Sequence, residues 1–280
     1  MSFRLAVAQT LVGLDQHANA AAVRDLMRDA AAAGANLVHF PEGAVSGYPS
    51  GPGKLHFKGW QVDWGGLRAE LESIAALAAQ RSIWVVVGAN HQLSGTTRPH
   101  NSLYVISPQG DLAGRYDKRL ISASEVADFY TPGRDPLVFE AGGFRFGLAL
   151  CIEINFPELF LDYAARGADV VLFSTYSEDP MFGVMARAYA AATNCWISLS
   201  TPCQFSPVLS SGVIGPHGRW VAQAPRDGQP ALALAELDRA DPDFDIALTK
   251  ARPWRAVARA GEIYAARDLT DPRSRDQSRF

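Results

Sequence analysis

The sequence predicts an α/β protein in which two mixed β-sheets are sandwiched between layers of helices. Three observations favour this fold class: strand-forming runs alternate with amphipathic helical segments, several neighbouring strands are joined by tight turns, and no linker divides the chain. Alternation with helices is typical of parallel pairing, whereas tight turns join antiparallel strands, so we expect mixed sheets.

The first half of the chain begins with a β-α-β unit and then repeats the helix-to-strand step. Gly34 is expected to end the first helix, because glycine readily adopts the left-handed conformation found at helix ends. Pro108 and Gly110 supply turn geometry between two later strands. The expected strands are 3–9, 36–40, 83–89, 101–107 and 112–117, and the expected helices are 16–33 and 66–80.

The second half of the chain repeats the alternation. A loop containing residues 131–133 leads into a strand that ends at Cys151. We expect one domain over residues 1–265, followed by a charged tail, 266–280, that is either frayed or ordered by a partner subunit. The expected strands are 144–150, 169–174, 196–200, 211–214, 220–224 and 231–237, and the expected helices are 157–166 and 182–193.

The composition is that of an ordinary soluble globular protein. Of the 280 residues 48% are hydrophobic and 20% charged, and the net charge of −3 gives no electrostatic reason to bind nucleic acid or an anionic membrane. No secretory leader or run of eighteen apolar residues is present, so we expect a cytoplasmic protein.

No cofactor is expected. The three cysteines, Cys151, Cys195 and Cys203, form no C-x-x-C pair, which disfavours both a disulfide framework and a zinc cluster. The His, Cys and Asp residues lack metal-ligand spacing, and no glycine-rich phosphate loop follows a strand.

Cys151 is the residue most suggestive of chemistry. It ends an apolar strand and is followed by a segment in which Pro157 is expected to open a helix. A thiol at such a corner is held rigidly and exposed, and the helix N-terminus favours a thiolate or an oxyanion nearby. The alternative is a buried structural cysteine, which is the common case for an intracellular chain.

A serine or histidine mechanism is disfavoured. None of the six histidines lies in a paired context that marks it as the base for a cysteine. Ser46, in the segment 43–47, stands one place too late for a G-x-S-x-G elbow.

Three strand ends each deliver one ionisable group: Glu42, Lys118 and Cys151. Strand ends on one edge of a sheet converge, which is where α/β enzymes build their sites. A thiol nucleophile needs a proton acceptor, which Glu42 would supply, and its tetrahedral intermediate needs positive charge, which Lys118 would supply. Singly, such a glutamate or lysine is usually a surface residue, so the prediction depends on their joint occurrence.

The segments around these three residues resemble the signatures of the nitrilase superfamily, the carbon–nitrogen hydrolases. The matching segments are 37–49, 114–118 and 151–158, supported by 101–102, 130–133 and 211–218. The resemblance implies an α-β-β-α four-layer sandwich, with Glu42 as general base and Cys151 as nucleophile. It also implies that Lys118 and the backbone N–H of Ile152 stabilise the oxyanion, and that water hydrolyses a covalent thioester.

The resemblance also implies a second glutamate between the lysine and the nucleophile. Glu125 is the candidate, as an orienter of the base or the substrate, against the alternative of a surface residue. Glu153 is expected to hold the corner at Cys151 by local hydrogen bonds. Tyr48 and Tyr176 are candidate walls of the substrate pocket. Phe57, Trp60 and Trp64, in the same aromatic loop as Tyr48, are further candidates for an acyl pocket, with structural packing as the alternative.

The favoured substrate is a small uncharged amide, hydrolysed to a carboxylic acid and ammonia. True nitrilases tend to carry tryptophan where this chain has Ile152, and N-carbamoyl-amino-acid hydrolases tend to carry an arginine in the turn that here contains Ile154 and Asn155. Both activities remain alternatives, as does a non-catalytic homologue that binds a metabolite. Because relatives associate through helices beside the nucleophile, we expect a homodimer or higher homo-oligomer, with the segment after Cys151 and the tail as candidate contacts.

Overall fold

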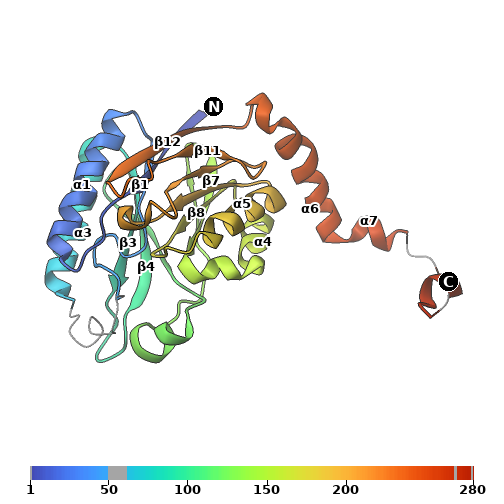
Figure 1. Cartoon of the computed structure of the whole chain (residues 1–280), viewed down its shortest axis with the longest axis horizontal. Helices are drawn as coiled ribbons and strands as arrows, with labels where there is room; N and C mark the ends of the chain where they lie inside the picture. The colour runs from blue at the N-terminus through green and yellow to red at the C-terminus, as the bar shows by residue number, and fades with distance from the viewer. Residues whose placement is uncertain (1, 50–61, 268–269, 279) are drawn as a thin grey trace.

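The computed structural model describes residues 2–49, 62–267, 270–278 and 280, and it has the predicted four-layer α-β-β-α architecture (Figure 1). Two six-stranded sheets face each other. The first contains, in order, β12 (Ala231–Asp238), β1 (Ser2–Gln9), β2 (Leu37–His39), β3 (Trp84–His91), β4 (His100–Ile106) and β5 (Leu112–Asp117). The second contains β11 (Trp220–Gln223), β10 (Gly212–Ile214), β9 (Trp196–Ser200), β8 (Val170–Ser174), β7 (Phe144–Leu150) and β6 (Val138–Ala141).

Both sheets are mixed, as the alternation of helices and tight turns predicts. In the first sheet β1, β2 and β3 are parallel, and β12, β4 and β5 pair antiparallel with their neighbours. In the second sheet β7, β8 and β9 are parallel and the outer strands are antiparallel. Each sheet therefore presents the carboxyl ends of parallel strands on one edge.

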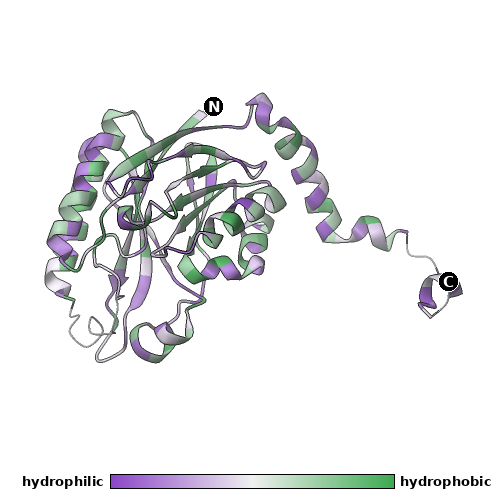
Figure 2. Ribbon diagram, viewed as in Figure 1, coloured by the Kyte–Doolittle hydropathy of each residue, from purple (hydrophilic) through white to green (hydrophobic). Residues whose placement is uncertain are grey.

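Helices cover the outer faces of the two sheets. Residues of α1 (Gln16–Ala32) and α3 (Trp64–Arg81) pack on the first sheet, and residues of α4 (Pro157–Ala165) and α5 (Met181–Thr193) pack on the second. A third apolar layer, which includes Phe144 and Trp196, fills the space between the sheets. Helix α1 alternates hydrophobic and hydrophilic residues along its length, as a helix with one buried face should (Figure 2).

Two parts of the chain were not predicted as regular structure. The strand β6 has four residues and pairs with β7 across Gly142 and Gly143, both at positive φ. Such a short edge strand gives little periodic signal. After β12 the chain forms α6 (Arg252–Ala260), α7 (Glu262–Ala265) and α8 (Pro272–Arg275), which project away from the sandwich (Figure 1). None of the three helices has a buried residue, so the burial pattern typical of a packed helix is missing.

No helix in the described part of the chain has both the length and the apolar character needed to cross a membrane.

His39 joins the two sheets through hydrogen bonds. Its side chain is fully buried, with Nδ1 2.8 Å from Ser198 Oγ and Nε2 2.7 Å from Ser174 Oγ. Burial lowers the pKa of His39 from 6.5 to about 3, so the imidazole is neutral in the folded protein. The histidine is therefore a structural link between the layers.

We predict that acid destabilises the protein partly through His39. Between pH 6.5 and about 3, His39 is protonated in the unfolded state but not in the folded state. The contribution of His39 to the free energy of unfolding is therefore fully present above pH 6.5 and is lost progressively as the pH falls. At pH 5 the loss in the free energy of unfolding is about 2 kcal/mol. In urea titrations from pH 7.5 to 5, the stability difference between wild type and His39→Gln should shrink by about that amount. A constant difference would contradict the assignment.

Candidate active site

Cys151 lies at the corner between β7 and a 3₁₀ helix, Cys151–Asn155, that precedes α4. Its φ of 47° is a left-handed backbone conformation that non-glycine residues rarely adopt, and its side chain is 9% exposed. Strained conformations of this kind persist where the surrounding structure fixes them, often at functional sites.

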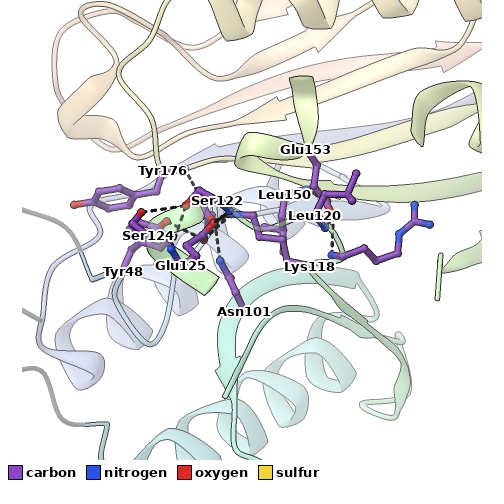
Figure 3. Close-up of polar contacts among 12 residues, drawn as sticks. Tyr48, Asn101, Lys118, Leu120, Ser122, Ser124, Glu125, Leu150, Glu153 and Tyr176 are labelled. Atoms are coloured by element: carbon purple, nitrogen blue, oxygen red, sulfur yellow. Dashed lines mark hydrogen bonds and ion pairs between the residues drawn. The ribbon is translucent and has the colours of Figure 1, made fainter. Parts of the chain in front are cut away.

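Glu153 fixes this corner, as the sequence predicted. Its buried carboxylate accepts hydrogen bonds from the backbone N–H of Leu150 at 2.7 Å, of Arg119 at 2.8 Å and of Leu120 at 3.1 Å, and from the Tyr116 hydroxyl at 2.8 Å (Figure 3). One side chain thus ties the residue before Cys151 to the segment that follows Lys118. Burial raises the pKa of Glu153 in spite of these hydrogen bonds.

Glu42 follows β2 and is completely buried. Its Oε1 accepts from Asn101 Nδ2 at 2.7 Å and from Lys118 Nζ at 3.1 Å, and its Oε2 accepts from the backbone N–H of Tyr176 at 2.8 Å. Three strand ends therefore hold the carboxylate: Asn101 lies at the start of β4, Lys118 follows β5 and Tyr176 lies just after β8.

Lys118 lies between two carboxylates, with its ammonium 3.1 Å from Glu42 and 2.7 Å from Glu125. All three side chains are buried, and Figure 3 shows Lys118 beside Glu125. Burial disfavours the charge on Lys118, but the charges of Glu42, of a Cys151 thiolate and of Glu125 outweigh burial and raise its pKa. The ammonium is therefore a permanent positive charge in this site.

Glu125 begins a π-helical turn, Glu125–Phe129. Its side chain is buried beside Lys118 and is not a surface residue. It accepts from the Tyr48 hydroxyl at 3.0 Å and from the backbone N–H of Ser122 at 2.7 Å. Burial opposes ionisation of Glu125, yet the adjacent Lys118 charge lowers its pKa overall. Glu125 is thus an ionised partner of Lys118.

The thiol of Cys151 is protonated at rest. Burial, followed by the charge of Glu42, raises the pKa of Cys151 to about 12, while Lys118 and Thr175 act in the opposite direction. Burial is the largest of these effects, and it opposes a resting thiolate. Among the carboxylates that raise this pKa, the charge of Glu42 has a larger effect than that of Glu125.

Aromatic side chains adjoin this cluster. The rings of Tyr48 and Tyr176 stack with their centroids 4.9 Å apart, and Phe205 contacts the Tyr176 ring edge-on at 5.0 Å. Ile152, next to the sulfur, is half-buried. Phe57 and Trp60 lie outside the described residues. Trp64 instead begins α3 and lines a cavity of about 490 Å³ between α3 and the outer face of the first sheet, with Leu71, Tyr104 and others.

Sequence reasoning missed Asn101 and Thr175 as site residues. Asn101 was noted only as part of a family segment, yet its amide holds Glu42. Thr175 directly follows β8 and lies beside the sulfur. It was missed because its sequence context does not differ from that of any buried threonine at a strand end. The signal that could have found Thr175 is its position, since Cys151 and Thr175 each directly follow one of two neighbouring parallel strands, β7 and β8.

Among the described residues, no three His, Cys, Asp or Glu side chains are grouped so that they could hold a metal ion.

The chain is similar to known carbon–nitrogen hydrolases. A family model described as carbon-nitrogen hydrolase matches residues 4–243. The deaminated glutathione amidase of Homo sapiens is 26% identical, over 84% of this chain and 76% of that protein. The chloroplastic omega-amidase of Arabidopsis thaliana is 22% identical, over 84% of this chain and 68% of that protein.

A solved structure shares the architecture. An amidase of the nitrilase superfamily from Nesterenkonia AN1, studied as a mutant, matches with a TM-score of 0.74 and 25% identity, over 90% of this chain and 97% of that one. The predicted sandwich and the family likeness are thus confirmed by independent comparisons.

We predict that Gly88 is required for the position of Glu42. A Cβ on Gly88 would lie 2.4 Å from Pro41 O, 2.7 Å from Gly43 N and 3.0 Å from Glu42 Cα, all backbone atoms. Gly88→Ala should therefore lower the free energy of unfolding by about 1–3 kcal/mol through overpacking, measured by urea denaturation. Gly65→Ala is the control, because its Cβ would meet only Asp63 Oδ1 at 3.5 Å. Equal stabilities of the two variants would refute the prediction.

Proposed function

The chain belongs to the carbon–nitrogen hydrolase family, and from that premise we propose that it hydrolyses a small amide to a carboxylic acid and ammonia through a thioester on Cys151. One observation supports the proposal above others: the buried Lys118 ammonium contacts both Glu42 and Glu125, and its charge acts on the Cys151 sulfur. A base, a nucleophile and a cation for the oxyanion are thereby present in one cluster.

The first half-reaction begins with the thiol in its protonated form. As the sulfur attacks the carbonyl carbon of the amide, the S–C bond forms and the thiol proton passes to Glu42. Because the pKa of Cys151 is about 12, ionisation ahead of attack is unfavourable and the two events are coupled. The carbonyl electron pair moves to oxygen, and the resulting oxyanion is stabilised by Lys118 and the backbone N–H of Ile152.

Release of ammonia completes the first half-reaction, and hydrolysis of the thioester is the second. When the intermediate collapses, the C–N bond breaks and Glu42 returns the proton to the leaving nitrogen, which departs as ammonia. Glu42 then takes a proton from a water molecule, whose oxygen attacks the thioester carbon. The C–S bond breaks, the sulfur regains a proton, and the carboxylic acid leaves.

Glu125 acts through Lys118 in this scheme. Its carboxylate holds the ammonium at 2.7 Å, and the Tyr48 hydroxyl, 3.0 Å away, holds the carboxylate. The oxyanion partner is thereby fixed before the reaction starts, so no reorganisation is needed in the transition state. We assign Glu125 as a positioning residue and Tyr48 as its support.

A small uncharged acyl group suits this site best. The aromatic rings of Tyr48 and Tyr176 adjoin the carboxylates, and the turn after Cys151 contains Ile154 and Asn155 and no arginine that could bind a substrate carboxylate. The two similar proteins from Homo sapiens and Arabidopsis thaliana described above are named as amidases, which supports an amide over a nitrile or an N-carbamoyl compound. A binding-only homologue is disfavoured because every position that the chemistry needs is filled.

We predict that Cys151→Ala folds normally but releases ammonia from small amides at least roughly a thousandfold more slowly than wild type, because the nucleophile is gone. Ammonia is measured with purified protein and acetamide, propionamide or butyramide. Cys195→Ala is the control, since that buried thiol donates to Ala168 O and lies outside the cluster. Undiminished turnover by the Cys151 variant would rule out thiol catalysis.

The same assay separates the alternatives. A panel of matched nitriles, amides and N-carbamoyl amino acids, scored by ammonia release, should give the highest kcat/KM for amides. A preference for nitriles or carbamoyl compounds would reassign the substrate, and no turnover of any class would favour a binding protein.

We also propose that the protein self-associates as a homodimer or larger homo-oligomer. Large apolar side chains are exposed on α4, α5 and α6: Leu161, Met181, Val184, Trp254 and Val257 are 41%, 51%, 53%, 60% and 50% exposed. Helix α6 is tied to the end of α5, because Arg259 donates to Ala192 O at 2.8 Å. We propose that these helices supply the apolar contacts between subunits, to which the tail 266–280, set apart from the proposed domain of residues 1–265, would add contacts. A cytoplasmic location is proposed from the sequence and is tested by cell fractionation.

We predict that the double variant Trp254→Glu, Val257→Glu shifts the protein to the mass of a monomer in sedimentation velocity, because two carboxylates would be placed in the apolar contact. Leu112→Glu is the control, since Leu112 is 58% exposed on β5, in the other sheet. The proposal is contradicted if wild type is already a monomer or if the double variant keeps its assembly.

A further inference from the structure

Thr175 and Cys151 occupy matching positions at the ends of two neighbouring strands. In the parallel register of β7 and β8, Leu150 is opposite Ser174, and Cys151 and Thr175 directly follow these two residues. Neighbouring strands lie about 4.8 Å apart. The threonine is therefore placed beside the nucleophile, and its hydroxyl acts on the sulfur.

The hydroxyl of Thr175 makes no directed hydrogen bond among the described residues, and the group on which it acts is the Cys151 sulfur. The residue is completely buried, and although its backbone N–H donates to Ser200 O at 2.9 Å, its Oγ1 makes no directed hydrogen bond in the described part of the chain. Burying a hydroxyl without a partner reduces stability, so valine, of the same shape, would suit the fold better. The hydroxyl can therefore donate a hydrogen bond to an acceptor that forms beside it during the reaction.

The sulfur is the group that could be this acceptor. The Thr175 hydroxyl lowers the pKa of Cys151, against the effects of burial and of Glu42. A neutral thiol is a weak acceptor, whereas a thiolate is a strong one. The hydrogen bond would therefore strengthen as the thiol proton leaves, which is the differential stabilisation that accelerates a step.

We propose that Thr175 is a positioning residue for the nucleophile, whose Oγ–H donates a hydrogen bond to the Cys151 sulfur as its proton passes to Glu42. The inference rests on the proposed function for the reaction in which it acts. Its physical content, stabilisation of the sulfur anion, is measurable without turnover.

The test compares Thr175→Val, which removes the hydroxyl at constant shape, with Thr175→Ser, which keeps it. The rate constant for alkylation of Cys151 by iodoacetamide is measured from pH 6 to 9, with the adduct located by mass spectrometry. Below its pKa a thiol reacts through its thiolate fraction, so loss of the hydrogen bond should lower the rate of the valine variant about tenfold at every pH. The serine variant should react within about twofold of wild type.

The outcomes separate this inference from the proposed function. Equal alkylation rates for wild type and Thr175→Val would overturn the inference, as would a serine variant as slow as the valine variant. Either result leaves the amidase proposal intact if Cys151→Ala is still inactive toward amides. Thermal melts complete the test: Thr175→Val should melt at or above the wild-type temperature, and a marked decrease would assign the hydroxyl a structural role and overturn the inference.

Discussion

The site depends on one buried ammonium between two buried carboxylates. Lys118, Glu42 and Glu125 are each almost inaccessible to water, and none of the three would be stable there as a lone charge. Removing one partner would leave the others uncompensated, so the cluster keeps its geometry only as a unit. That geometry fixes where negative charge can develop, because the ammonium cannot turn away from its two acceptors.

The strand ends supply the rigidity that this cluster requires. Glu42 is held by groups at the start of β4, after β5 and after β8, and Glu153 ties the end of β7 to the segment after β5. The two sheets meet at this edge, so the site is built across both. A strained backbone at Cys151, with φ of 47°, is tolerated because Glu153 fixes the residue before it.

Much of this arrangement was predictable from the sequence, and the failures have physical reasons. Glu42, Lys118 and Cys151 were found because each stands at the end of a predicted strand, and Glu125 was suggested by family resemblance where its own context gave no signal. The role of Thr175 and the hydrogen-bond partners of His39 were missed. The neighbours of these side chains lie on strands that are distant in sequence, and which residues meet depends on how those strands align. The helix α6 was missed although its sequence is amphipathic, and α7 and α8, of four residues each, are too short to show a period.

The balance of charge in the site also bears on what it accepts. One cation and two carboxylates leave a net charge of −1 around a neutral thiol, in an environment that water hardly reaches. A substrate carboxylate would add repulsion at short range, where screening is weak, whereas a neutral amide adds none. When the oxyanion forms, the proton that has moved to Glu42 removes one negative charge, so the net charge is the same before and after attack. The cluster thus favours neutral substrates and transfers a proton within itself, which keeps the electrostatic cost of the reaction low.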